Sequence, residues 1–151
     1  MKINKNIEKS NFYGDLIFST DYWGLFLAPD QTYLGTCVLI LKRDCTGLRN
    51  LKKKEWIEFN ELVKTIELGF MDTFDVTLFN WACAANLAFR DNETHIKPQV
   101  HWHMHPRYKN PVIFNGLKFI DENFGYAPRP SSKKLEDDLR RKIIEKIREN
   151  F

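Results

Sequence analysis

The sequence predicts an α+β fold in which short strands form a sheet, one long helix packs on it and a second helix lies near the C-terminus. Three observations lead to this prediction. Short apolar runs alternate with turn residues, one longer stretch repeats its apolar side chains with helical spacing, and Asn115-Gly116 separates two apolar runs as in a two-residue hairpin. No linker divides the 151 residues, so we expect a single domain over residues 1–151, with residues 1–14 as a loosely ordered arm.

The strands are predicted by β-branched and large apolar residues bounded by turns. We expect strands over residues 15–19, 22–27, 33–42 and 74–83, and a hairpin over residues 111–119. A further strand covers residues 98–107, because His101, His103 and His105 alternate with large apolar residues. Pro106 fixes φ and lacks an N–H donor, so we expect this strand to end there or to lie at an edge.

Two stretches have the spacing of an amphipathic helix. In residues 53–71 the apolar side chains recur three and four residues apart, at Trp56, Phe59, Leu62, Val63, Ile66 and Phe70. In residues 132–150 we expect Ser132 to cap a helix whose apolar face carries Leu135, Leu139, Ile143, Ile144 and Ile147. Both stripes are typical of helix faces that pack on a core.

Composition excludes several classes of protein. A net charge of +3 is too small to indicate nucleic acid, and the longest strongly apolar run, residues 37–41, is too short to cross a membrane. Three cysteines without a CxxC pair and a polar N-terminus without a signal peptide predict a cytoplasmic protein with reduced thiols. The basic stretch 42–54 is either a solvated loop and helix start or a rim that attracts anionic ligands.

The three alternating histidines are the strongest functional signal. They fall on one face of the predicted strand, where three imidazoles are hard to bury because each needs a donor and an acceptor as partners. His-x-His on a strand is common in metal sites, and His95, Asp91 or Glu93 would then supply a further ligand. Alternatively, a neutral imidazole attacks phosphorus while its neighbours bind the oxygens and protonate the leaving group.

The segment His101-Trp102-His103-Met104-His105 resembles the signature of the histidine triad superfamily, which contains nucleotidyl hydrolases and transferases. The resemblance covers residues 30–107: it includes residues 30–44 with their Lys42-Arg43 ending, the helix at 53–71, Phe79-Asn80-Trp81 and Pro106-Arg107. Residues 119–126 look like an extension in the diadenosine tetraphosphate hydrolase-like branch. The resemblance implies an antiparallel sheet of about five strands with one long helix, in a homodimer.

The resemblance also implies an activity, the cleavage of a nucleoside phosphate anhydride, with a dinucleoside polyphosphate as the expected substrate. His103 would be the nucleophile that forms a nucleotidyl-histidine intermediate, His101 would fix its ring, and His105 would contact the phosphate and assist the leaving group. The residues placed at the nucleotide are Asn80, Lys97, Gln99, Arg107, Asp30 and Gln31. The chemistry requires no metal or other cofactor in the protein, although Mg²⁺ often accompanies a polyphosphate substrate.

Two features depart from the family pattern. Asp44 stands where many members have a fourth histidine bonded to the first histidine of the triad, and it either replaces that bond with a charge-assisted one or caps a turn. Lys97 and Pro98 stand where many members have Gln and Ser or Thr, and Gln99 is displaced by two positions. Two alternatives therefore remain: a nucleotide-binding regulator with little or no catalysis, and a metal-dependent enzyme that uses the three histidines as ligands.

Overall fold

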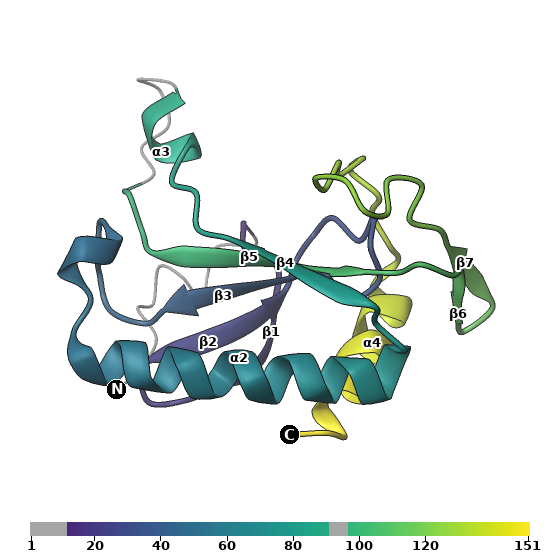
Figure 1. Cartoon of the computed structure of the whole chain (residues 1–151), viewed down its shortest axis with the longest axis horizontal. Helices are drawn as coiled ribbons and strands as arrows, with labels where there is room; N and C mark the ends of the chain where they lie inside the picture. Colours follow the sequence, from purple (N-terminus) through teal and green to yellow (C-terminus); the bar gives the residue numbers. More distant parts are fainter. Residues whose placement is uncertain (1–11, 91–96) are drawn as a thin grey trace.

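The centre of the protein is a five-stranded antiparallel sheet in the order β1-β2-β3-β5-β4. The computed structural model describes residues 12–90 and 97–151. The strands are β1 (Asp15–Ser19), β2 (Trp23–Leu27), β3 (Cys37–Leu41), β4 (Leu78–Ala82) and β5 (His101–Arg107). The long helix α2 (Lys53–Phe74) runs along one face of the sheet, and α4 (Asp137–Arg148) lies near the C-terminus (Figure 1). This arrangement confirms the predicted α+β fold class.

The smaller elements lie outside the main sheet. They are a 3₁₀ turn (Leu48–Asn50), the short helix α3 (Leu87–Arg90), and a hairpin of β6 (Val112–Phe114) and β7 (Leu117–Phe119). Asn115 (φ 49°) and Gly116 (φ 81°) form the two-residue turn of this hairpin, as predicted. Positive φ at both positions is what a type I′ turn requires, and it is why this dipeptide predicts hairpins well. None of the helices in residues 12–90 and 97–151 is both long and apolar enough to cross a membrane.

The main core lies between α2 and the sheet. Trp102 and Met104 of β5 point into it: Met104 is fully buried and the Trp102 ring lies 4.9 Å from the ring of Phe59. The other three tryptophans of the chain also surround Phe59, with centroid distances of 5.4 Å for Trp23, 5.9 Å for Trp56 and 6.2 Å for Trp81. Because side chains alternate along a strand, the three histidines occupy the opposite face of the sheet.

Several element boundaries differ from the prediction. Helix α2 continues to Phe74 and ends at Asp75, whose left-handed backbone (φ 56°) lets its N–H bond to the Met71 carbonyl. The strand expected from residue 74 therefore begins at Leu78. β3 begins at Cys37 because residues 33–36 form a turn, in which the Tyr33 carbonyl accepts bonds from the backbone and side chain of Thr36.

The C-terminal helix also begins later than predicted. Ser132 is not its cap, because this residue has a left-handed backbone (φ 61°) and its N–H bonds to the Asp30 carboxylate. Arg140 then fixes α4 to the edge of the sheet: it donates to the Asp15 carboxylate (2.7 Å) and to the Leu27 carbonyl (2.9 Å). The interaction is long-range, and sequence periodicity alone does not reveal it.

Pro106 neither ends β5 nor lies in an edge strand. The strand continues to Arg107, whose carbonyl accepts a bond from Thr77 on the β4 side. Backbone groups alternate between the two sides of a strand, so the position of the missing Pro106 N–H faces β3. The last β3 pairing is Cys37 with Met104, so no ladder bond is lost at Pro106.

The segment just before β1 is more tightly attached than predicted. Residues 1–11 of the expected arm lie outside the described residues, but Tyr13 is buried, at 8% exposure. Gly14 makes this possible: its φ is +100°, and a Cβ there would lie only 1.8 Å from the Leu27 carbonyl oxygen. A glycine therefore allows the chain to pass close to β2 and to place Tyr13 on the histidine face.

Candidate active site

The triad occupies the middle of the sheet, on the face opposite α2. In the β3–β5 ladder His103 pairs with Val38 and His101 with Ile40, and in the β4–β5 ladder His105 pairs with Asn80. The ring centroids of His101 and His103 are 5.0 Å apart, and those of His103 and His105 are 6.3 Å apart with nearly parallel planes. The predicted row of three imidazoles on one face is confirmed.

The surroundings of the triad favour neutral imidazoles. Burial lowers the pKa of all three histidines, and the neighbouring His101 and His105 help to lower the pKa of His103 to about 4. His103 is therefore uncharged at neutral pH, with a lone pair on one ring nitrogen. The Nδ1 atom of His101 lies 2.7 Å from the Gln99 carbonyl, and since a carbonyl only accepts, Nδ1 carries the proton.

His105 retains an unused hydrogen-bonding atom. Its Nδ1 is buried and has no hydrogen-bond partner among the described residues, while the centroids of the Tyr33 and His105 rings lie 5.9 Å apart in an edge-to-face arrangement. Buried polar atoms without partners are rare in folded proteins. The atom is thus a candidate for contact with a ligand.

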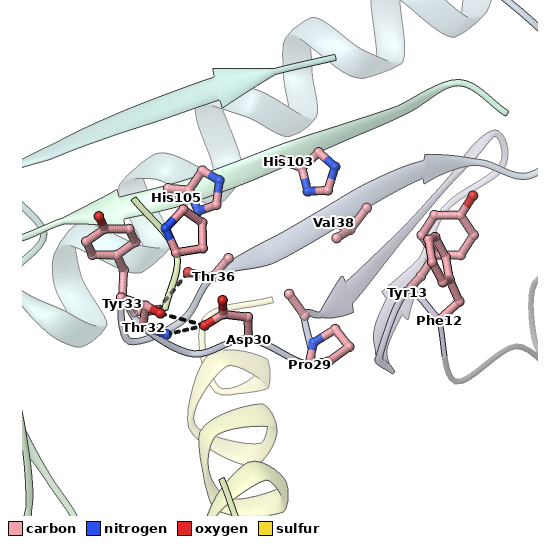
Figure 2. A pocket seen from close by; sticks show the side chains of 12 residues that line it. Phe12, Tyr13, Pro29, Asp30, Thr32, Tyr33, Thr36, Val38, His103 and His105 are labelled. Atoms are coloured by element: carbon pink, nitrogen blue, oxygen red, sulfur yellow. Dashed lines mark hydrogen bonds between the residues drawn. The ribbon is translucent and has the colours of Figure 1, made fainter. Parts of the chain in front are cut away.

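Two cavities meet at His103. The first, of about 300 Å³, is bordered by Asp30, Tyr33, His105 and the Phe12-Tyr13 pair (Figure 2), and we call it the Asp30 cavity. The second, of about 240 Å³, is lined by Lys97, Gln99, His101 and residues 84–88, and we call it the Lys97 cavity. Phe12, Tyr13 and His103 line both cavities. The middle histidine can therefore contact groups bound on either side of this aromatic pair.

The structure brings three predicted nucleotide-binding residues to these cavities: Asp30, Lys97 and Gln99. Asp30 borders the first, and exposed Lys97 borders the second. Burial alone would raise the pKa of the Asp30 carboxyl, but hydrogen bonds from Thr32, Ser132 and Lys133 outweigh it and hold this pKa below its usual value. Asp30 is therefore a fixed negative charge at the cavity wall.

The side chains of Gln31 and Gln99 bond to the protein backbone. Gln31 is fully buried and bonds to the carbonyls of Ala28 and Thr36 and to the Gly35 N–H, which fixes the turn after β2. The Gln99 amide donates to the carbonyls of Leu41 and Arg43 and accepts from the Cys45 N–H, which joins the end of β3 to the start of β5. Both residues position the site, and their direct contact with a nucleotide stays a prediction.

Arg107 is also occupied inside the protein. It is fully buried and donates five hydrogen bonds, two to the Asp121 carboxylate (2.6 and 2.9 Å), one to Asn80 Oδ1 (2.7 Å), and one each to the carbonyls of Asn123 (2.7 Å) and Tyr126 (2.8 Å). A guanidinium has five N–H donors, so none remains for a ligand. Arg107 instead orients the amide of Asn80 beside His105, and its own nucleotide contact stays a prediction.

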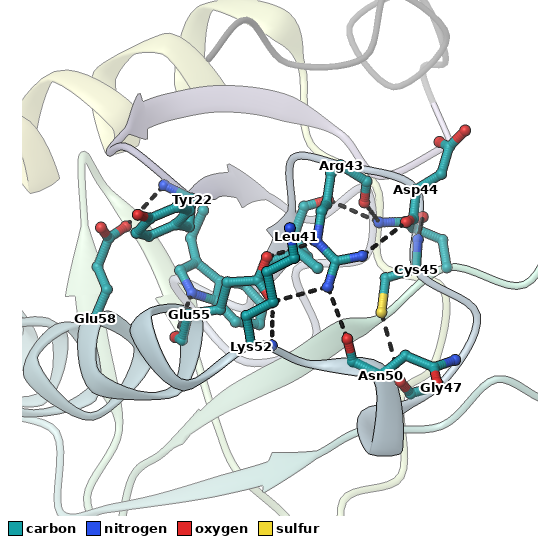
Figure 3. Close-up of polar contacts among 12 residues, drawn as sticks. Tyr22, Leu41, Arg43, Asp44, Cys45, Gly47, Asn50, Lys52, Glu55 and Glu58 are labelled. Atoms are coloured by element: carbon teal, nitrogen blue, oxygen red, sulfur yellow. Dashed lines mark hydrogen bonds and ion pairs between the residues drawn. The ribbon is translucent and has the colours of Figure 1, made fainter.

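Asp44 follows β3 and has an exposed side chain, which extends away from the Arg43–Glu55 pair in Figure 3. The Nδ1 atom of His101 bonds to the Gln99 carbonyl. A bond from Asp44 to His101 stays a prediction. Arg43 forms a bidentate ion pair with the buried Glu55 (2.6 and 2.9 Å). Within the basic stretch, this arginine therefore stabilises the fold, and its charge is paired with Glu55 instead of being open to an anionic ligand.

The metal interpretation finds no preformed site in the part of the chain that is described: no three His, Cys, Asp or Glu side chains there are arranged to hold one ion. Its proposed additional ligands, His95, Asp91 and Glu93, lie outside the described residues. Sequence reasoning missed Phe12, Tyr13 and Asp121 as parts of the site. The one available signal for the first two was a glycine, Gly14, directly after two aromatic residues.

Comparison with solved structures identifies the fold. No protein-family model matches the sequence, and no curated protein matches it. Solved structures do match: a hypothetical histidine triad nucleotide-binding protein from Sulfolobus tokodaii has a TM-score of 0.68 at 16% identity, covering 97% of this chain and 87% of that one. Histidine triad proteins from Bradyrhizobium japonicum (TM-score 0.67, 13% identity, 99% and 96% covered) and Marinobacter aquaeolei (0.66, 14%, 99% and 94%) are similar. The chain therefore has the fold of the histidine triad proteins.

Proposed function

We propose that this protein is a nucleotide hydrolase or transferase of the histidine triad type, which cleaves a nucleoside phosphate anhydride. The observation that carries the proposal is the place of His103: a neutral imidazole borders both cavities, flanked by two further imidazoles on a rigid sheet. Such a group is a nucleophile with space on either side for the two halves of an anhydride.

The proposed reaction has two steps. A lone pair of His103 attacks the α-phosphorus, the bond to the bridging oxygen breaks, and its electron pair leaves with that oxygen, which takes up a proton. Water then attacks the same phosphorus, the P–N bond breaks, and the electron pair returns to the imidazole. His105 Nδ1 is the candidate phosphate contact, and the Gln99 carbonyl keeps the His101 ring beside His103.

The two cavities support a substrate with two substantial ends, for which we propose a dinucleoside polyphosphate. The Asp30 cavity is mainly apolar and aromatic, through Phe12, Tyr13 and Tyr33, which suits the flat ring of a nucleobase. The Lys97 cavity carries a cation beside residues 84–88, which are apolar except for Asn86, and this lining suits a phosphate chain followed by a second apolar group. Mg²⁺ is expected to accompany the polyphosphate, and addition of EDTA would test this.

The decisive experiment is incubation with diadenosine polyphosphates and with adenosine phosphoramidates, comparing the wild type with His103→Ala. We expect turnover by the wild type, loss of at least about a thousandfold in the variant, and an adenylylated His103 trapped by quenching in alkaline denaturant, since acid would hydrolyse the P–N bond. Lys64→Gln, an exposed change on α2, is the matched control and should behave as the wild type. Adenosine monophosphate binding without any wild-type turnover would instead identify a nucleotide-binding regulator.

We also propose that the protein is a cytoplasmic homodimer. The dimer is what the resemblance of the sequence to the histidine triad superfamily implies, and the unpaired Cys37, Cys45 and Cys83 support a reducing compartment. Light scattering coupled to gel filtration would measure the molar mass in solution. A mass near 18 kDa at micromolar concentration would contradict the dimer.

A further inference from the structure

A third cavity, of about 380 Å³, lies behind the wall of the Asp30 cavity, and most of its charged side chains are basic. Thr32 and Tyr33 border both cavities. Lys118, Arg129 and Lys133 line this third cavity, which we call the basic cavity, and Glu122 is the carboxylate among its lining residues. Three cations against one carboxylate create a locally positive potential that favours an anion.

The fold does not use these three charges for ion pairs. None of the ion pairs between described residues involves them. Arg129 bonds to the Tyr33 hydroxyl through its backbone N–H (2.8 Å), and the Lys133 ammonium lies 4.1 Å above the ring of Phe119. The nearby Arg107, in contrast, donates all of its five bonds within the protein. The cations of the basic cavity therefore keep their capacity to bind a ligand.

The segment that carries two of these cations is fixed to the loop that borders the histidine site. The Ser131 N–H donates to Thr32 Oγ1 (2.8 Å), and the Lys133 N–H donates to the Asp30 carboxylate (3.1 Å). The Thr32 hydroxyl hydrogen is directed to Asp30 (2.6 Å), so this hydroxyl is already engaged and leaves recognition of an anion to the cations. A fixed backbone reduces the entropy lost when the charged side chains order around a ligand.

We propose that the basic cavity is a second anion-binding site, for a phosphate-type oxyanion. A multiply charged oxyanion gains more from three cations than a carboxylate does, and it suits the forked donors of arginine and the point charges of lysine. The oxyanion has two possible sources. It is either a second phosphate on the ribose of a nucleotide in the Asp30 cavity or a free anion such as pyrophosphate. The proposal does not depend on catalysis at His103.

The test is titration of the full-length, ¹⁵N-labelled protein with pyrophosphate, followed by amide NMR signals. Binding at the basic cavity should shift the signals of Lys118, Arg129 and Lys133, whereas binding at the triad should shift those of residues 101–105. The variant Lys118→Gln/Arg129→Gln should weaken the first set of shifts by about tenfold or more in dissociation constant. Glu122→Gln should strengthen them severalfold, because it removes the opposing charge.

The matched control is Lys54→Gln/Lys64→Gln, which removes two exposed positive charges from α2, on the other face of the sheet. It should leave the pyrophosphate affinity within about twofold of the wild type, since exposed charges beyond a Debye length are screened. Equal weakening by both double variants, or no shifts at residues 118–133, would overturn the proposal. Shifts at residues 101–105 read out the proposed active site separately.

The source of the oxyanion is resolved with adenosine monophosphate and adenosine 3′,5′-bisphosphate. If a ribose phosphate occupies the basic cavity, the bisphosphate should bind about tenfold tighter than the monophosphate, and Lys118→Gln/Arg129→Gln should remove that difference. If the oxyanion is free, pyrophosphate should shift the signals of residues 118–133 even when the monophosphate is bound. Failure of both patterns contradicts the proposal.

Discussion

The buried ion pair between Arg107 and Asp121 predicts a large stability change from a single isosteric substitution. Asp121→Asn keeps the size of the side chain but removes the carboxylate that accepts from Arg107 Nε (2.6 Å) and Nη2 (2.9 Å). The same carboxylate accepts from the backbone N–H groups of Tyr108 (3.3 Å) and Asn123 (3.2 Å). An asparagine has one oxygen, so its NH₂ group must face N–H donors that now lack an acceptor.

The magnitude follows from burial. Both partner side chains are at most 1% exposed, so the guanidinium would be left without a counter-ion in a site that water does not reach. Removing one partner of such a pair typically costs about 3–5 kcal/mol of the free energy of unfolding. For a domain of this size we expect the thermal midpoint to fall by about 10 °C.

Urea unfolding followed by tryptophan fluorescence measures this change, because all four tryptophan rings pack around Phe59 in the folded state. Asp138→Asn is the matched control: its ion pairs with Arg141 and Lys142 lie on the exposed surface of α4, and its unfolding curve should overlay that of the wild type. A loss below about 1 kcal/mol for Asp121→Asn would refute the reasoning that this pair is buried and unsolvated.

Three further predictions follow from the fold and the site. The pKa of His103 is about 4 in the folded protein and about 6.5 when unfolded, so the unfolded chain binds more protons and stability falls as the pH drops from about 6.5 towards 4. His103→Gln should flatten this part of a plot of melting temperature against pH. An unchanged slope would contradict the burial of the ring. Gly14→Ala should lower the free energy of unfolding by more than about 2 kcal/mol, because the new Cβ would clash with the Leu27 carbonyl. Gly116→Ala, which has a similar φ but open space, should lower it by about 1 kcal/mol in the same urea assay. Equal losses would mean that the segment before β1 relaxes. Phe59→Ala should lower the free energy of unfolding by about 3 kcal/mol and change the tryptophan emission of the folded state, since four indoles lose a shared neighbour. An unchanged emission spectrum would argue against the packing of the four tryptophans around Phe59.

The sequence alone determined the features that depend on local geometry. Alternation placed His101, His103 and His105 on one face, helical spacing located α2, and Asn115-Gly116 located the hairpin turn. These predictions were confirmed because a period of two or 3.6 residues and the positive φ of a turn are properties of neighbouring residues. The predicted boundaries of the elements were less accurate. Helix α2 ends at Asp75 because this residue has a left-handed backbone, and Ser132 bonds to Asp30 instead of capping α4.

Only the tertiary structure decided how each polar side chain is used. Gln31, Gln99 and Arg107 resemble ligand-binding residues by their type and position, but their donors and acceptors are occupied by groups elsewhere in the protein. Tyr13, from a segment expected to be loosely ordered, instead forms a wall of both cavities at His103. The physical reason is that a hydrogen-bonding group is satisfied by whichever partner the fold brings within about 3 Å. The partners of Gln99 are 54 to 58 residues away in the sequence, and those of Arg107 are 14 to 27 residues away.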